Sequence, residues 1–69
     1  MDTNVLKGKW RQLKGEAQKQ WGKLTDDDLD VINGEKETLL GKLQEKYGHT
    51  KEAAQEEYDR WESGWRDRL

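Results

Sequence analysis

Four acidic residues in the middle of the chain have a spacing that could hold a calcium ion. They are Asp26, Asp28, Asp30 and Glu37. Counted from the first of them, they match the first, third, fifth and twelfth positions of a calcium-binding loop. The sixth position of such a loop needs glycine for a sharp turn, and this chain has Val31 there. We therefore expect no metal site. Thr25 and the carboxylates after it are better explained as the start of a helix.

The single histidine and the single serine, His49 and Ser63, are the side chains that could supply a base and a nucleophile. His49 follows Gly48 at a predicted turn, and no pattern pairs it with Ser63. The absence of cysteine excludes a disulfide, a thiolate nucleophile and a cysteine-based zinc site. A chain of 69 residues is also too small to enclose a sizeable pocket. We predict that the protein is not an enzyme and has no catalytic residue, bound metal or cofactor.

Charged residues make up 41% of the chain and are distributed unevenly. Residues 1–24 hold six bases and two acids, whereas residues 25–69 hold seven bases and thirteen acids. The basic segment includes Trp10 and Trp21, a combination that occurs in nucleic-acid-binding surfaces. Both tryptophans fall on an apolar stripe, where packing is their usual role, and the net charge is −2. Nucleic-acid binding is therefore only a further alternative.

The longest apolar runs are pairs of residues, far short of the roughly 20 residues that span a membrane. The first four residues do not have the basic and apolar pattern of a signal peptide. We predict no membrane span and a cytoplasmic location.

The elements that would position these residues are helices. The chain has no proline, few β-branched residues, and apolar residues that recur every three or four positions. This spacing predicts helices over residues 4–21, 26–32, 35–47 and 50–61, with Gly22 in a left-handed conformation after the first. The fold class is all-α, a small array of four short helices in one domain spanning residues 1–69. Its ordered core covers about residues 4–62, because Gly64 should let the last turn fray after Trp61.

Glycines recur in register along the two halves of the chain. With an offset of 26 residues, Gly8, Gly15 and Gly22 align with Gly34, Gly41 and Gly48. Each half then continues into a helix with a threonine at its start. The register indicates two helix-glycine-helix units packed face to face, although chance similarity is the alternative.

Three of these glycines, Gly8, Gly15 and Gly41, are predicted to lie on helix faces opposite the apolar stripes. Glycine there costs roughly 0.5–1 kcal/mol relative to alanine. Neutral drift on an exposed face is one explanation. The other is a strip of bare backbone where a partner approaches closely.

Two segments of the chain carry a family resemblance: residues 22–28, preceded by Trp10 and Trp21, and residues 41–48. They resemble the CsbD-like family of small bacterial stress-response proteins. The resemblance extends from about Leu6 to Trp61. It implies a cytoplasmic bacterial protein with an all-helical fold that is induced in a general stress response. It implies no enzymatic activity and no known binding residues.

Two functions are therefore compared. The leading one is a non-enzymatic stress-response protein that acts as a hydrophilic protectant through its charge-dense surface. The alternative is a helical adaptor that binds an unknown protein partner or itself, with Trp65 as the exposed anchor and Gly8, Gly15 and Gly41 as further contacts. We expect a monomer, with weak self-association as the alternative.

Overall fold

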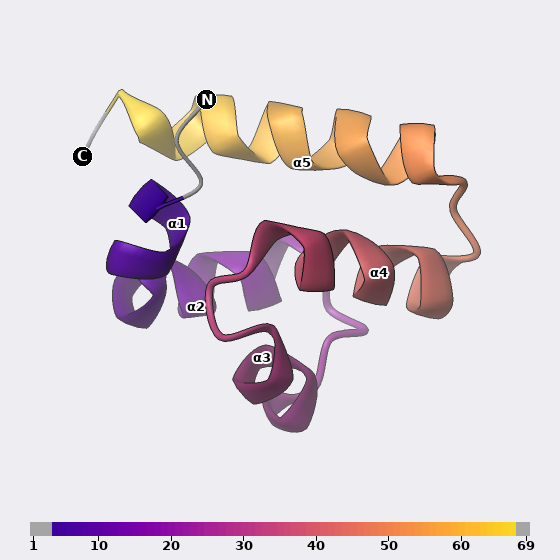
Figure 1. Cartoon of the computed structure of the whole chain (residues 1–69), viewed down its shortest axis with the longest axis horizontal. Coiled ribbons are helices and arrows are strands. Elements are labelled where there is room, and N and C mark those ends of the chain that lie inside the picture. Colours follow the sequence, from indigo (N-terminus) through magenta and orange to yellow (C-terminus); the bar gives the residue numbers. More distant parts are fainter. Residues whose placement is uncertain (1–3, 68–69) are drawn as a thin grey trace.

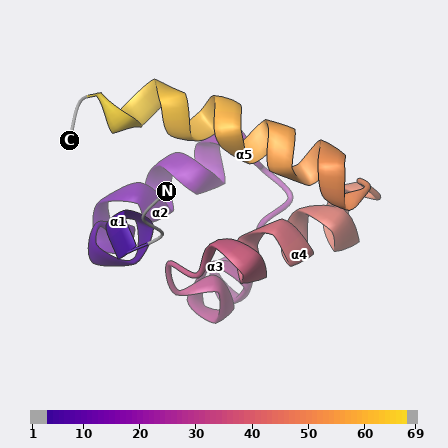
Figure 2. The same cartoon turned by 45° about the horizontal axis from the view of Figure 1, so that its top comes forward.

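Helices account for all the regular secondary structure in residues 4–67, the part of the chain that this computed structural model describes. They are α1 (Asn4–Gly8), α2 (Trp10–Gln20), α3 (Asp26–Ile32), α4 (Lys36–Tyr47) and α5 (Lys51–Arg66). The longest helix, α5, runs antiparallel to α4, and α3 packs across the other side of α4 (Figure 1). Helices α1 and α2 complete the array beside α3 and α4, below the C-terminal half of α5, as the turned view also shows (Figure 2). The predicted all-α fold is confirmed.

The first predicted helix is divided in two. Lys9 leaves the helical conformation, with φ −111° and ψ 11°, so that α1 and α2 run in different directions (Figure 1). The preceding Gly8 is a weak helix former. The change of direction allows Leu6 and Trp10, from the two helices, to enter the same core. Burial of these two side chains outweighs the loss of helical regularity at one residue.

The C-terminal ends of α3 and α4 follow the predicted signals, whereas that of α2 does not. Asn33 and Gly34 after α3, and Gly48 after α4, are left-handed, with φ of 46°, 80° and 68°. The prediction for Gly22 is wrong, because α2 ends at Gln20, its C-cap Trp21 has φ −125°, and Gly22 is not left-handed. This more extended exit places Trp21 and Leu24 in the core, each 1% exposed.

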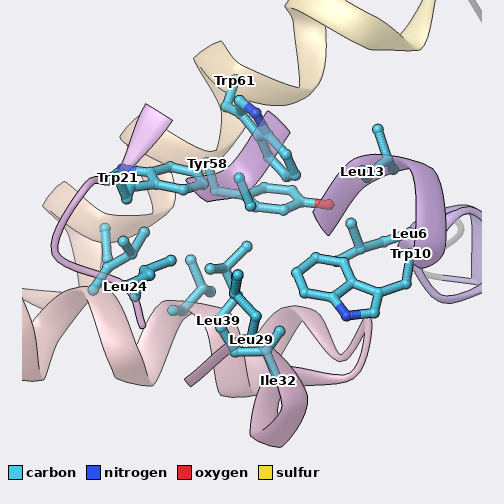
Figure 3. Packing of buried hydrophobic residues seen from close by; sticks show 14 of the residues in the cluster. Leu6, Trp10, Leu13, Trp21, Leu24, Leu29, Ile32, Leu39, Tyr58 and Trp61 are labelled. Atoms are coloured by element: carbon cyan, nitrogen blue, oxygen red, sulfur yellow. The ribbon is translucent and has the colours of Figure 1, made fainter. Parts of the chain in front are cut away.

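One cluster of apolar side chains forms the core, and aromatic rings dominate its centre (Figure 3). The ring of Trp61 lies 5.1 Å from Trp21, 5.8 Å from Tyr58 and 5.4 Å from Trp65, measured between centroids. All three contacts are tilted or edge-on, which suits the quadrupoles of the rings. The buried apolar residues are Leu6, Trp10, Leu13, Ala17, Trp21, Leu24, Leu29, Ile32, Leu39, Leu40, Leu43, Ala54, Tyr58, Trp61 and Trp65.

The prediction that the chain frays after Trp61 is wrong. Helix α5 continues to Arg66, and Trp65 is only 2% exposed. Packing of the Trp65 ring against Trp61 outweighs the helix-weakening effect of Gly64, whose own face is open. The fraying expected at residues 1–3 and 68–69 lies outside the described residues.

The burial of Trp65 leads to a first prediction. Trp65→Ala should lower the free energy of unfolding by about 3–5 kcal/mol, because it removes a large ring from the core. Val31→Ala is the control, since Val31 is 61% exposed, and it should change stability by less than about 0.5 kcal/mol. Urea denaturation followed by tryptophan fluorescence and circular dichroism measures both. Equal stabilities for the two variants would show that Trp65 lies outside the core.

The glycines lead to a second prediction, because they differ in what surrounds them. An added Cβ at Gly15 or Gly41 would meet nothing within 4 Å. Replacing either by alanine should therefore raise the free energy of unfolding by about 0.5–1 kcal/mol and raise Tm. At Gly34 a Cβ would come within 2.7 Å of the Lys7 Cα, and φ is +80°. Gly34→Ala should lower Tm.

Thermal melts of the three alanine variants test this contrast. A lower Tm for Gly15→Ala or Gly41→Ala would show that their predicted solvent-facing positions are wrong.

Candidate functional site

The acidic residues of the possible calcium loop are not brought together around one point. Asp28 is buried at the start of α3, whereas Asp30 is exposed and lies 3.8 Å from the Lys14 ammonium. Glu37 is in the first turn of a different helix, α4. Within residues 4–67, no group of three or more carboxylates or imidazoles is placed to hold a metal ion. Asp26 and Asp28 are instead in the first turn of α3, and Asp28 and Asp30 form ion pairs with lysines.

Asp28 is the most strongly held of these carboxylates. It completes a capping box, in which the Thr25 backbone N–H donates to Asp28 Oδ2 at 2.9 Å and the Asp28 N–H donates to Thr25 Oγ1 at 3.1 Å. The ammonium groups of Lys42 and Lys46, from α4, approach the same carboxylate at 3.4 and 3.0 Å. The Thr25 hydrogen bond and then the two lysines hold the pKa of Asp28 far below its usual range. The ion pairs of this carboxylate therefore link the start of α3 to α4.

His49 lies in a second polar cluster, where the loop before α5 meets the end of α2. Its Nε2 contacts the carboxylate of Glu57, and its ring stacks on Tyr47 at 5.7 Å between centroids. The Trp21 indole N–H donates to the other Glu57 oxygen at 2.8 Å. The Lys23 backbone N–H donates to the Tyr47 hydroxyl at 3.1 Å. The cluster therefore joins the α2–α3 loop to α4 and α5.

The two candidate residues for nucleophilic chemistry are far apart. Ser63 is exposed near the C-terminal end of α5, whereas His49 precedes the first turn of that helix. At 1.5 Å per residue, about 18 Å of helix separates them. The structure does not bring these two residues together as a base and a nucleophile.

The position expected for Trp65 is also wrong, because its ring is in the core. Its neighbours on α5 form a short polar chain, in which the Tyr58 hydroxyl donates to Glu62 at 3.2 Å and Arg66 contacts Glu62 at 3.3 Å. Burial, and then the Glu62 carboxylate, raise the pKa of Tyr58 well above its usual value. Tyr58 is therefore a neutral donor that satisfies the buried Glu62 carboxylate.

The two tryptophans of the basic segment are unavailable for stacking on bases. Trp10 is 7% exposed and Trp21 is 1% exposed, and both belong to the core. Stacking on a nucleic-acid base needs an exposed ring face. The basic side chains around them nevertheless remain at the surface, and some of them line a depression.

This depression, which we call the basic groove, lies where α1, α2 and the end of α3 meet. Its volume is about 390 Å³, and its lining residues are Lys7, Gly8, Trp10, Arg11, Lys14, Asp30 and Asn33. Of the candidate glycines, only Gly8 lines the groove. Gly15 and Gly41 lie on the open faces of α2 and α4. A partner contact at these two glycines stays a prediction.

The sequence did not predict the groove because its cations come from α1 and α2, whereas its carboxylate, Asp30, comes from α3. The available signal was the spacing of Lys7, Arg11 and Lys14, which would share one face of the single helix predicted over residues 4–21. No sequence signal placed Asp30 and Asn33 opposite them.

The structure therefore defines a small, all-helical protein with clusters of charged side chains at its surface. The profile of the CsbD-like family matches residues 4–56. A UPF0337 protein of Pectobacterium atrosepticum is 53% identical over 62 residues, which cover 90% of each chain. The UPF0337 protein YjbJ of Escherichia coli K12 is 46% identical over 63 residues, which cover 91% of each chain. A UPF0337 protein of Pseudomonas aeruginosa is 54% identical over 57 residues, 83% of this chain and 88% of the relative.

The chain therefore belongs to the CsbD-like family, which confirms the resemblance seen in its sequence. The names of these relatives state no molecular activity. No solved structure matches the chain. None of the helices in the described range is long and apolar enough to cross a membrane.

The environment of Asp28 leads to a third prediction, on pH. Because its folded-state pKa is far below the ordinary value of about 4, its contribution to stability is complete above about pH 5 and is lost as the pH falls further. The free energy of unfolding of the wild type should therefore fall on acidification more steeply than that of Asp28→Asn. Urea denaturation at a series of pH values from about 5 to 2 measures both slopes.

Asp27→Asn is the matched control for this experiment. Asp27 is in the same first turn of α3 but is exposed, and it makes no ion pair with another described residue. This variant should keep most of the wild-type slope. If Asp27→Asn and Asp28→Asn flattened the slope equally, the special environment of Asp28 would be refuted.

Proposed function

We propose that the protein is a non-enzymatic, cytoplasmic stress-response protein that acts as a hydrophilic protectant. Its work would be physical: the folded domain occupies the space between other macromolecules as water is lost and does not adhere to them. Membership of the CsbD-like family supports the stress setting, and the surface of the molecule supports the mechanism.

The observation that carries this proposal is the lack of exposed apolar surface. Among the described residues, Val31 is the one large hydrophobic side chain that is exposed, at 61%. The other large apolar side chains lie in the core or pack against it. Charged residues make up 41% of the chain. A surface with dense charges of both signs stays hydrated and resists association.

The adaptor hypothesis loses its main support in this structure. Its anchor was to be an exposed Trp65, and that ring is 2% exposed. Binding energy at protein interfaces is concentrated in a few aromatic and arginine side chains that become buried. With all four tryptophans in the core, the described surface offers no aromatic anchor of this type.

The fourth prediction tests the protectant function directly. A labile enzyme dried and rehydrated with this protein should keep more activity, and scatter less light, than the same enzyme with an equal mass of a folded globular protein of similar size and an ordinary charge density. The reason is that a surface of high charge density retains water and does not adhere to unfolding chains. Equal protection by the two proteins would refute the proposal.

Val31→Gln separates this mechanism from capture of exposed apolar segments. The substitution removes the exposed valine while leaving the charges and the core unchanged. Protection should stay the same if hydration is the cause. A large loss of protection would indicate chaperone-like apolar binding instead.

A further inference from the structure

The basic groove has the features of a binding site that the protectant function does not need. Three cations line it, Lys7, Arg11 and Lys14, together with one carboxylate, that of Asp30. Arg11 and Lys14 are three residues apart on α2 and therefore lie on the same face of that helix, and Lys7 lines the groove from α1, beyond the break at Lys9. The groove therefore presents a row of positive charge rather than a single point.

These cations are only partly neutralised by the protein. Arg11 makes no ion pair with another residue in the described range, and Lys14 is held loosely, 3.8 Å from Asp30. Lys7 is paired with Glu35 at 2.7 Å, but both side chains are more than half exposed. Exposed pairs of this kind contribute little to stability, so an anion of higher charge can replace Glu35 and Asp30 as their partner.

The size and polarity of the groove restrict the class of ligand. A volume of about 390 Å³ is near the lower end for small-molecule sites. Its single large apolar lining residue, Trp10, is 7% exposed, so little apolar surface is available. Drug-like and lipid ligands need an apolar lining. A compact and highly charged anion suits this groove better.

The glycine at position 8 also favours a compact anion as the ligand, because it leaves the backbone accessible. A Cβ at this position would meet nothing within 4 Å, and the residue lines the groove. A side chain here would occupy space between the cations. Glycine leaves that space to the ligand, and it lets the ligand approach the backbone.

We propose that the basic groove binds the phosphate chain of a small oligophosphate. The Arg11 guanidinium can contact two phosphate oxygens at once, whereas Lys7 and Lys14 act as point charges on either side of it. The phosphate chain is present both in inorganic triphosphate and in a nucleoside triphosphate. Because the Trp10 ring is buried, the groove offers no stacking surface for a base, and the phosphates alone carry the recognition.

The fifth prediction is that inorganic triphosphate binds saturably to the full chain at low ionic strength. The measurements are isothermal titration calorimetry and amide shifts in a nitrogen-15 NMR titration, both without divalent cations. The shifts should concentrate at Gly8, Arg11 and Asn33. Orthophosphate should bind more weakly, because it reaches fewer cations. Adenosine triphosphate should bind with the same affinity as inorganic triphosphate. If the nucleotide binds more tightly and shifts the same amides, its phosphates still occupy the groove.

Four variants make the test specific. Arg11→Gln should weaken binding about tenfold or more, since it removes a charge-assisted bidentate contact. Lys19→Gln is the matched control: it removes one exposed cation from the same helix outside the groove. It should change affinity by no more than about twofold. Asp30→Asn should tighten binding several-fold by removing a like charge. Gly8→Ala should weaken binding while raising Tm, a combination that loss of folding cannot produce.

Three results would overturn the proposal. The first is the absence of a saturable shift at Gly8 or Arg11 with triphosphate. The second is an equal loss of affinity in Lys19→Gln and Arg11→Gln, which would indicate unspecific attraction to the basic segment. The third is tighter binding of a short DNA duplex than of triphosphate, with shifts spread over the whole of α2, which would indicate a nucleic-acid surface.

Discussion

The contact of Trp61 with the rings of Trp21, Tyr58 and Trp65 is the interaction on which the rest of the structure depends. It joins α5 to the end of α2 and closes the core. Helices of five and seven residues, such as α1 and α3, are too short to persist in water by themselves. They are held because this core gives their few apolar residues a surface to pack against. The basic groove, which α1 and α3 help to line, and the ion pairs of Asp28 on α3 therefore depend on this core.

Local signals were sufficient to predict much of this fold. The spacing of apolar residues located the helices, and Thr25 and Thr50 were correctly placed at the starts of two of them, with side chains that accept from backbone N–H groups. The break at Lys9 and the burial of Trp65 were not predictable in this way. Both result from packing between residues distant in sequence, which outweighs local helix propensity. The same reason applies to the basic groove, whose two sides come from different helices.

The glycine repeat shows how the same residue type takes different roles at matching positions. Gly15 and Gly41 correspond in sequence, and both lie on open helix faces. Gly8 and Gly34 correspond equally well, yet Gly8 is helical and open whereas Gly34 is left-handed and within reach of the Lys7 backbone. The similarity of the two halves thus holds for Gly15 and Gly41 but not for Gly8 and Gly34. Close packing of α1 against the α3–α4 turn makes the difference, and it requires glycine at only one of the two positions.

The composition of the chain also limits what kind of recognition is possible. Only 30% of the residues are hydrophobic, and the core uses nearly all of the large ones. A domain this small cannot divert apolar side chains to an interface without losing stability. Recognition of another molecule must then rely on charge and hydrogen bonding at the described surface. The charge is distributed unevenly along the chain, which is basic in residues 1–24 and acidic after them. A protein that resists unspecific apolar contact can therefore still bind a small anion selectively, because the two properties depend on different side chains.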